Sequence, residues 1–300
     1  MKRENLTAHA AVLGANIIYG LNYVIAKGIM PHWMAPRAII FLRVIGAAAA
    51  FWLVGALMKN KQPVARTDLR RMFVAALFGV AINQILFFEG LNLTTPINAS
   101  IIMVGTPVLV LVMSHLIIRE RISGMKLTGV LLGFGGAVFL ILRNGHFSLS
   151  SGTALGNLLI LINASSYGLF IVLVKPLMSR YHPITVMKWV FGFGLLFVVP
   201  VTAGPFFHTD FRVIPFNIWM SVLYVVLFTT IFAYLLNNYS LKKISPSANS
   251  SYMYLQPALA SLVAIVAGKD RLTTTEIIAS LMIFAGVYFV NRPGKKIPAG

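Results

Sequence analysis

The sequence predicts an all-α integral membrane protein whose ten transmembrane helices form two inverted five-helix repeats. Three observations lead to this fold class: the composition, the length of the apolar runs and an internal repeat. Hydrophobic residues make up 58% and charged residues 11% of the 300 residues, whereas soluble domains contain about 45–50% and about 25% of these classes. The apolar runs are about 20 residues long, the length that an α-helix needs to cross the hydrocarbon of a bilayer. We therefore expect lipid to surround this chain.

The internal repeat relates residues 91–140 to residues 241–290. Aligned without a gap, the two stretches match at 11 of 50 positions, and the alignment places Pro107 on Pro257. Apolar composition alone would not readily align prolines and charged hairpins at one offset, so the match indicates a duplicated unit. Five spans per copy is an odd number, which reverses the direction of the second copy in the membrane.

Ten apolar runs give the expected spans, at 8–28, 36–58, 70–90, 97–117, 125–143, 153–175, 184–203, 217–237, 247–267 and 275–291. They divide into a first repeat, 8–143, and a second repeat, 153–291. Pro107 and Pro257 lie near the middle of spans four and nine, where each removes a backbone donor. Because matched helix breaks in inverted repeats point to a binding site near the midplane, we interpret both prolines as gating or kink positions. A simple packing kink remains the alternative.

Lysine and arginine are unevenly divided between the two sides of the predicted topology. With the N-terminus inside, 17 of them lie inside and 6 outside, a bias that predicts cytoplasmic termini and a multi-pass protein of the plasma (inner) membrane. Their clustering in short loops explains the net charge of +18 without a nucleic-acid partner. The chain contains no cysteine, so thiolate metal sites are excluded, and we expect no metal.

The charges at membrane depth need an explanation, because each costs roughly 2.5–3.5 kcal/mol at the centre of a span. Arg43 lies about 10 Å along span two. It could form an ion pair with Glu89, or it could join Lys27 in an electropositive pocket for a carboxylate or phosphate. We expect Glu89 and the hairpin residues Glu120 and Asp270 to be structural charges.

Polar and aromatic side chains inside the spans predict a moderately polar cavity, since unsatisfied amides in lipid are costly. Some of them will only join helices to one another. The candidate substrate-binding residues are Asn22, Arg43, Asn83, Gln84, Ser100, Met103, Tyr167, Tyr234, Asn249 and Met253.

In the order and spacing of its motifs, the chain resembles the drug/metabolite transporter superfamily, specifically its ten-helix EamA-type transporters. The motifs are Tyr19-Gly20-Leu21-Asn22 with Lys27, Pro36 followed by Arg43, the end of span four at Arg119-Glu120-Arg121, and a glycine-rich fifth span. In the second half, Asp270 stands where the family often has Glu, and no arginine matches Arg43. The resemblance implies transport of small metabolites, mostly outward, by alternating access and without a cofactor.

We therefore expect an inner-membrane exporter of small metabolites, such as amino acids or related amphipathic solutes, that acts as a monomer or homodimer in the lipid bilayer. A flippase for lipids or lipid-linked sugars would share the architecture and remains the alternative. A membrane-embedded enzyme fits less well, because the chain has seven acidic residues and only Glu89 at depth, too few for a convergent catalytic site.

Overall fold

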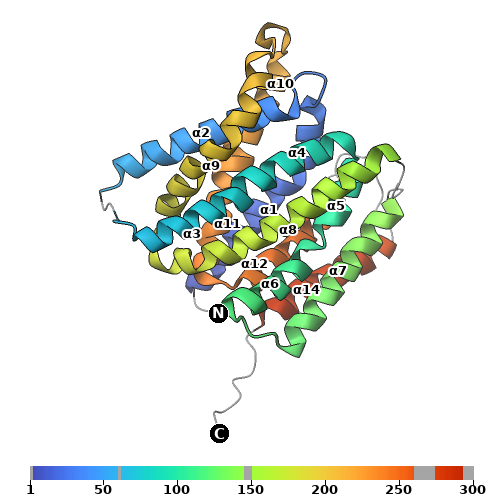
Figure 1. The fold of residues 1–300 in the computed structure, drawn as a ribbon. Coiled ribbons are helices and arrows are strands. Elements are labelled where there is room, and N and C mark those ends of the chain that lie inside the picture. The colour runs from blue at the N-terminus through green and yellow to red at the C-terminus, as the bar shows by residue number, and fades with distance from the viewer. Residues whose placement is uncertain (1–2, 60–61, 145–150, 260–273, 293–300) are drawn as a thin grey trace.

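A computed structural model of the chain describes residues 3–59, 62–144, 151–259 and 274–292. Within these ranges the chain is helical and contains no strand. Figure 1 shows the helices packed side by side, with α2 and α9 at one edge of the bundle and α7 and α14 at the opposite edge. The predicted all-α class is confirmed.

The helices follow the predicted spans closely. Those of the first half are α1 (Arg3–Ile29), α2 (Pro36–Leu57), α3 (Arg66–Ala76), the π-helix η1 (Leu77–Ile82), α4 (Asn83–Leu93), α5 (Pro96–Met103), α6 (Thr106–Ile118) and α7 (Gly124–Asn144). Those of the second half are α8 (Ser151–Arg180), α9 (Pro183–Phe207), the 3-10 turn η2 (Phe211–Val213), α10 (Phe216–Tyr224), the π-helix η3 (Val225–Phe232), α11 (Ala233–Lys243), α12 (Pro246–Ser251), the 3-10 turn η4 (Tyr252–Tyr254) and α14 (Thr274–Asn291).

Seven helical segments among the described residues are long and apolar enough to cross a membrane. Two shorter apolar helices, Gly124–Phe139 and Ile277–Asn291, occupy the positions of spans five and ten. Span nine is described only to residue 259, so the rest of that span and Asp270 lie outside the described residues. The helices therefore agree with the predicted membrane-protein fold in type, order and position.

Spans four and nine are both interrupted. α5 ends at Met103 and α6 begins at Thr106, with Pro107 in its first turn. In span nine, α12 passes into η4, and Pro257 follows in the first turn of the next helical stretch. The first turn of a helix tolerates proline because the missing N–H has no intrahelical partner there. Each proline thus lies where a half-span restarts and not inside an uninterrupted helix.

Spans three and eight each contain a π-helical stretch, η1 and η3, which the sequence did not predict. In a π-helix the carbonyl of residue i accepts from the N–H of residue i+5, whereas in an α-helix it accepts from residue i+4. Where the two kinds of helix meet, some backbone carbonyls therefore have no N–H partner. Hydroxyl groups bind such carbonyls here: Tyr234 Oη donates to the oxygen of Gly79 at 2.8 Å, and Thr230 Oγ1 donates to that of Val225 at 2.8 Å. Short π stretches in helices are frequent at functional sites.

The two halves pack against each other in matched pairs. α1 packs on α11 and α4 packs on α8, which are equivalent contacts if the halves are related by a twofold axis. α2 packs on α9 and α7 packs on α14, each pairing an element with its own counterpart. At the last contact a Cβ atom added to Gly286 would lie 2.6 Å from the backbone nitrogen of Gly133. The glycines of the fifth span therefore form a close helix contact.

In each half, a lysine of the first span binds the end of the third. Lys27 Nζ donates hydrogen bonds of 2.8–3.1 Å to three carbonyl oxygens at the end of α4, those of Leu91, Asn92 and Thr94. Lys175 Nζ donates to two carbonyl oxygens at the end of α11, those of Leu241 and Ile244. A cation is favourable there because the last carbonyls of a helix carry a partial negative charge.

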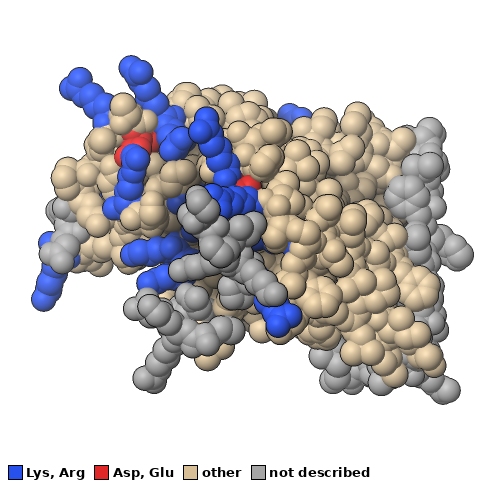
Figure 2. All heavy atoms as spheres, turned by 90° about the horizontal axis from the view of Figure 1, so that it is seen from below, with Lys and Arg blue, Asp and Glu red and all other residues tan. Residues whose placement is uncertain are grey.

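Basic side chains gather toward one end of the face shown in Figure 2, and most of the rest of that face is uncharged. Two ion pairs tie basic residues to loop or helix-start acids: Lys126 to Glu120 at 2.7 Å and Arg180 to Asp68 at 3.0 Å. Burial raises the pKa of the Glu120 carboxyl, but Lys126 and the hydroxyl groups of Ser245 and Ser247 lower it, and the net pKa is below its ordinary value. The Glu120 carboxyl therefore stays ionised to a lower pH than an ordinary glutamate does.

Candidate functional site

A cavity lies between the two halves, and about 510 Å³ of space in and around its mouth, open solvent included, is free of protein atoms. Both halves contribute side chains to its wall. The lining residues are Tyr19, Asn22, Tyr23, Arg43, Asn83, Gln84, Phe87, Met103, Asn163, Tyr167, Thr229, Tyr234, Met253 and Gln256. Aromatic rings and methionines form much of this wall, and a few polar groups converge on the space, which is typical of a small-molecule site.

Helical spacing explains how the first half places these side chains. Tyr19, Asn22 and Tyr23 are three and four residues apart on α1, so they share one face of that helix. Gln84 and Phe87 are three residues apart on α4, directly after η1. The interruptions in spans four and nine place Met103 and Met253 on the same wall.

Arg43 is the charged residue of the cavity wall. Its side chain belongs to α2 and is only 4% exposed. The guanidinium donates from Nε to Thr230 Oγ1 at 2.7 Å, and its carbon lies 4.6 Å from the centroid of the Phe88 ring. Among the side chains that the structure describes, no carboxylate pairs with Arg43. A buried cation in contact with only neutral groups is costly and calls for an anion.

The other two charges considered with Arg43 have different partners. Glu89 pairs with Arg37 at 2.7 Å, so the alternative of an Arg43–Glu89 ion pair is not realised. Lys27 does not line the cavity, because its ammonium group binds the carbonyls at the end of α4. The electropositive character of the cavity therefore comes from Arg43 without Lys27.

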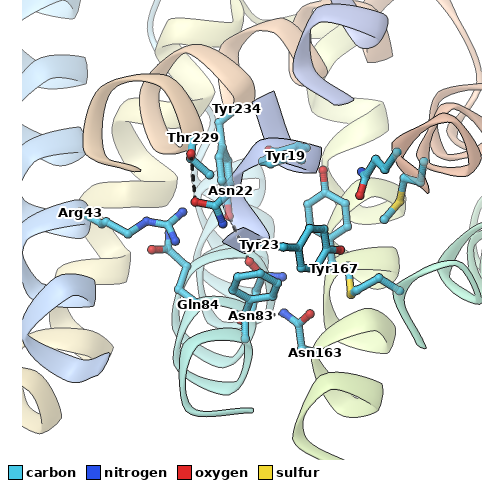
Figure 3. A pocket seen from close by; sticks show the side chains of 14 residues that line it. Tyr19, Asn22, Tyr23, Arg43, Asn83, Gln84, Asn163, Tyr167, Thr229 and Tyr234 are labelled. Atoms are coloured by element: carbon cyan, nitrogen blue, oxygen red, sulfur yellow. Dashed lines mark hydrogen bonds between the residues drawn. The ribbon is translucent and has the colours of Figure 1, made fainter. Parts of the chain in front are cut away.

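Hydrogen bonds fix the orientation of several lining side chains, as the labelled residues in Figure 3 show. Thr229 Oγ1 donates to Asn22 Oδ1 at 3.2 Å. Asn163 Nδ2 donates to the backbone oxygen of Asn83 at 2.7 Å, and the Tyr234 hydroxyl lies 3.2 Å from Asn83 Oδ1. These contacts cross between the halves, so the site is organised before a solute arrives.

Two buried amides in the cavity keep unsatisfied atoms. Gln84 is 1% exposed, yet neither its Nε2 nor its Oε1 has a hydrogen-bond partner among the described residues. Asn163 is fully buried, and its Oδ1 also lacks a partner within the same ranges. A buried polar atom without a partner costs about 1–3 kcal/mol. Unsatisfied groups in a cavity wall are therefore suited to bind a polar ligand.

Eight of the ten predicted substrate-binding residues line this cavity, namely Asn22, Arg43, Asn83, Gln84, Met103, Tyr167, Tyr234 and Met253. Ser100 and Asn249 do not. The Asn249 amide nitrogen instead donates to the backbone oxygen of Asn237 at 3.3 Å and to the Ser240 hydroxyl, which joins α12 to α11.

Five lining residues were named neither among the predicted substrate-binding residues nor in the sequence motifs, namely Tyr23, Phe87, Asn163, Thr229 and Gln256. Their helical spacing contains a usable signal. Tyr23 follows Tyr19 by four residues, and Phe87 follows Asn83 by four, so each shares a face with a residue that was recognised.

Comparison with known proteins identifies the family. The sequence profile of the EamA-like transporter family matches residues 6–142 and again residues 154–292. The chain belongs to the EamA-like transporter family. The resemblance drawn from the sequence motifs is thereby confirmed, and EamA-like proteins are transporters, not enzymes.

EamA-like relatives cover almost the full length of the chain. The uncharacterized transporter YyaM of Bacillus subtilis is 22% identical, with 95% of this chain and 93% of YyaM aligned. An uncharacterized transporter of Archaeoglobus fulgidus is 25% identical over 87% of this chain and 90% of its own length. A protein of Streptantibioticus cattleyicolor named probable terminal-alkyne amino-acid exporter is 22% identical over 83% of this chain and 82% of its own.

A solved structure shares the overall fold of the chain. A crystal structure superposes with a TM-score of 0.73 at 20% identity and covers 96% of both chains. At this identity the likeness concerns the fold alone.

In the part of the chain that the structure describes, no group of three or more His, Cys, Asp and Glu residues could hold a metal ion.

Proposed function

We propose that this EamA-like transporter exports small amphipathic solutes that carry a carboxylate, amino acids or related compounds, through its central cavity. The observation that carries the proposal is Arg43, a cation that is 4% exposed and has no carboxylate partner among the described side chains. A solute carboxylate would supply the missing partner, and the planar guanidinium suits a two-point contact with it.

The remaining wall supports an amphipathic solute. Tyr19, Tyr23, Phe87 and Tyr167 offer ring surface, and Met103 and Met253 add flexible apolar contacts. The name of the Streptantibioticus relative as an amino-acid exporter supports the same solute class.

The paired interruptions support alternating access. Span four of the first half and span nine of the second half are both interrupted, and spans three and eight contain the π-helical stretches η1 and η3. All four spans contribute side chains to the cavity wall, so a rocking motion of one half against the other would change the exposure of the cavity. The basic bias of the loops favours cytoplasmic termini in the plasma membrane. A monomer contains the whole cavity, and a homodimer is not needed to complete it.

The test is transport by protein reconstituted into liposomes, using a panel of radiolabelled carboxylate solutes, with and without a pH gradient. Arg43→Ala should lose transport while keeping normal expression and monodisperse behaviour in detergent. Arg37→Ala is the matched control, because Arg37 lies on the same helix, is 51% exposed and pairs with Glu89.

The proposal would be refuted if the wild-type protein transported none of the carboxylate solutes, or if Arg43→Ala transported them as well as the wild type does. Transport that depends on lipid headgroup and is not competed by soluble carboxylates would point to a flippase instead.

A further inference from the structure

We infer that the transported solute carries a net charge of −1 and that its other polar groups are neutral hydrogen-bond donors, as in a hydroxy acid or an N-acyl amino acid. The inference rests on the proposed function and narrows it, because it excludes zwitterionic amino acids as the preferred solutes. Two independent features of the cavity lead to it: its charge balance and the nature of its unsatisfied atoms.

The charge balance is uneven. Arg43 is the one charged residue among the fourteen described residues that line the cavity. The acids with described side chains are engaged elsewhere: Glu89 with Arg37, Glu120 with Lys126 and Asp68 with Arg180. Asp210 accepts from the backbone nitrogen of Arg212 in a loop.

The net charge of the occupied cavity decides which solute it favours. A monoanion bound at Arg43 leaves the cavity neutral. A zwitterion brings a second cation together with its carboxylate, so the occupied cavity still carries one uncompensated positive charge. Such a charge is strongly disfavoured in a poorly polarisable interior, where Coulomb interactions are less screened than in water.

The position of the unsatisfied acceptors gives the second argument. Gln84 Oε1 and Asn163 Oδ1 are buried acceptor atoms without a donor among the described residues. Figure 3 shows the Gln84 amide beside the Arg43 guanidinium. A solute carboxylate at Arg43 would also lie within reach of a donor, Gln84 Nε2.

An ammonium group held at Gln84 Oε1 would then face the guanidinium at short range and be repelled. A hydroxyl or an amide N–H donates to the same oxygen without adding charge. The amide pair therefore matches an α-hydroxy or α-acylamino group better than an α-ammonium group. The aromatic wall remains available for the body of the solute.

Pairs of isosteric solutes test the inference directly. 3-Phenyllactate and phenylalanine share their carbon skeleton and carboxylate but differ in a hydroxyl in place of an ammonium, as do 2-hydroxy-4-methylpentanoate and leucine. The four compounds would be compared as competitors of transport, and by the shift in thermal unfolding, on wild-type protein in liposomes and detergent. We expect the affinity for each hydroxy acid to be at least about tenfold higher than that for its amino-acid partner; tenfold is equivalent to about 1.4 kcal/mol.

Two substitutions locate the origin of this preference. Arg43→Gln removes the uncompensated charge and should reduce the preference to about twofold or less, well under the tenfold that corresponds to 1.4 kcal/mol. Arg37→Gln, on the same helix but outside the cavity, should retain it. Because the wild-type comparison uses no variant, the inference is tested even if Arg43→Gln does not fold.

The outcomes separate the inference from the proposed function. If amino acids bind as tightly as their hydroxy-acid partners, or more tightly, and their transport depends on Arg43, the proposed function stands and the inference is wrong. Tighter binding of the hydroxy acids that persists in Arg43→Gln would also overturn the charge argument. Failure of all four solutes and of every other carboxylate to bind refutes both.

Discussion

The close contact between α7 and α14 makes a quantitative prediction about stability. A Cβ atom on Gly286 would lie 2.6 Å from Gly133 N and 2.7 Å from both Gly129 O and Gly133 Cα, all backbone atoms that cannot turn aside. In Gly286→Ala the helices must therefore separate by about 0.8 Å to restore ordinary contact, and overpacking of this kind typically costs about 1–3 kcal/mol.

Gly135→Ala is the matched control for this substitution. Its added Cβ would meet only Met282 Cε, at 3.7 Å, which is an ordinary contact with a flexible side chain. Both substitutions replace a helix-interior glycine with alanine, so the gain in helix propensity of about 0.5–1 kcal/mol cancels between them. The difference between the two variants reports the contact alone.

Reversible unfolding in mixed detergent micelles would measure the free energy of unfolding of both variants. We expect Gly286→Ala to be less stable than Gly135→Ala by about 1–3 kcal/mol. Neither helix lines the cavity, so the solute affinity of the folded fraction should match that of wild type. Equal stability of the two variants would show that the helix contact is looser than the structure indicates.

Three further predictions concern charge and motion. Because the pKa of Glu120 is lowered in the folded protein, its contribution to stability should be complete above the unfolded-state pKa of about 4.3 and lost as the pH falls through the folded-state value. The free energy of unfolding of Glu120→Gln should therefore fall less than that of the wild type when the pH is lowered into the acid range. An unchanged pH profile would contradict this. Lys27→Met should lower the thermal unfolding temperature, since it leaves carbonyls at the end of α4 without their donor, whereas Lys27→Arg should restore part of it; no loss in Lys27→Met would exclude the capping role. Pro107→Ala should slow turnover more than it weakens solute affinity, and an unaltered rate would assign the break to packing.

The sequence predicts the spans and the duplication well because both depend on strong, local signals. Apolar runs of membrane length are hard to mistake, and a proline aligned with a proline survives extensive divergence. The π-helical stretches have no comparable signal. Residues 77–82 read Leu-Phe-Gly-Val-Ala-Ile, a composition that suits an α-helix equally well. Their π-helical conformation depends on hydrogen bonds that the hydroxyl groups of distant residues, such as Tyr234, donate to the backbone.

The partners of the charged residues could not be predicted for a different reason. Arg37 and Arg43 lie six residues apart on α2, and both can approach the region of Glu89 and Phe88. Which arginine forms the ion pair with Glu89 depends on the rotation of α2 relative to α4. In the structure Arg37 forms this pair, and Arg43 lies against the Phe88 ring. Ser100 and Asn249 illustrate the same limit. Both residues precede the interruption of their span, and whether their side chains reach the cavity depends on how α5 and α12 are rotated in the bundle.

The crossed packing of the two halves has a consequence for how the chain can be divided. The contacts of α1 with α11, α4 with α8, α2 with α9 and α7 with α14 all join one half to the other. Cutting the chain between residues 144 and 151 would sever one covalent connection and none of these interfaces. Two fragments made in the same cell should find each other and restore activity, whereas either fragment alone would turn its share of buried amides toward acyl chains and be degraded.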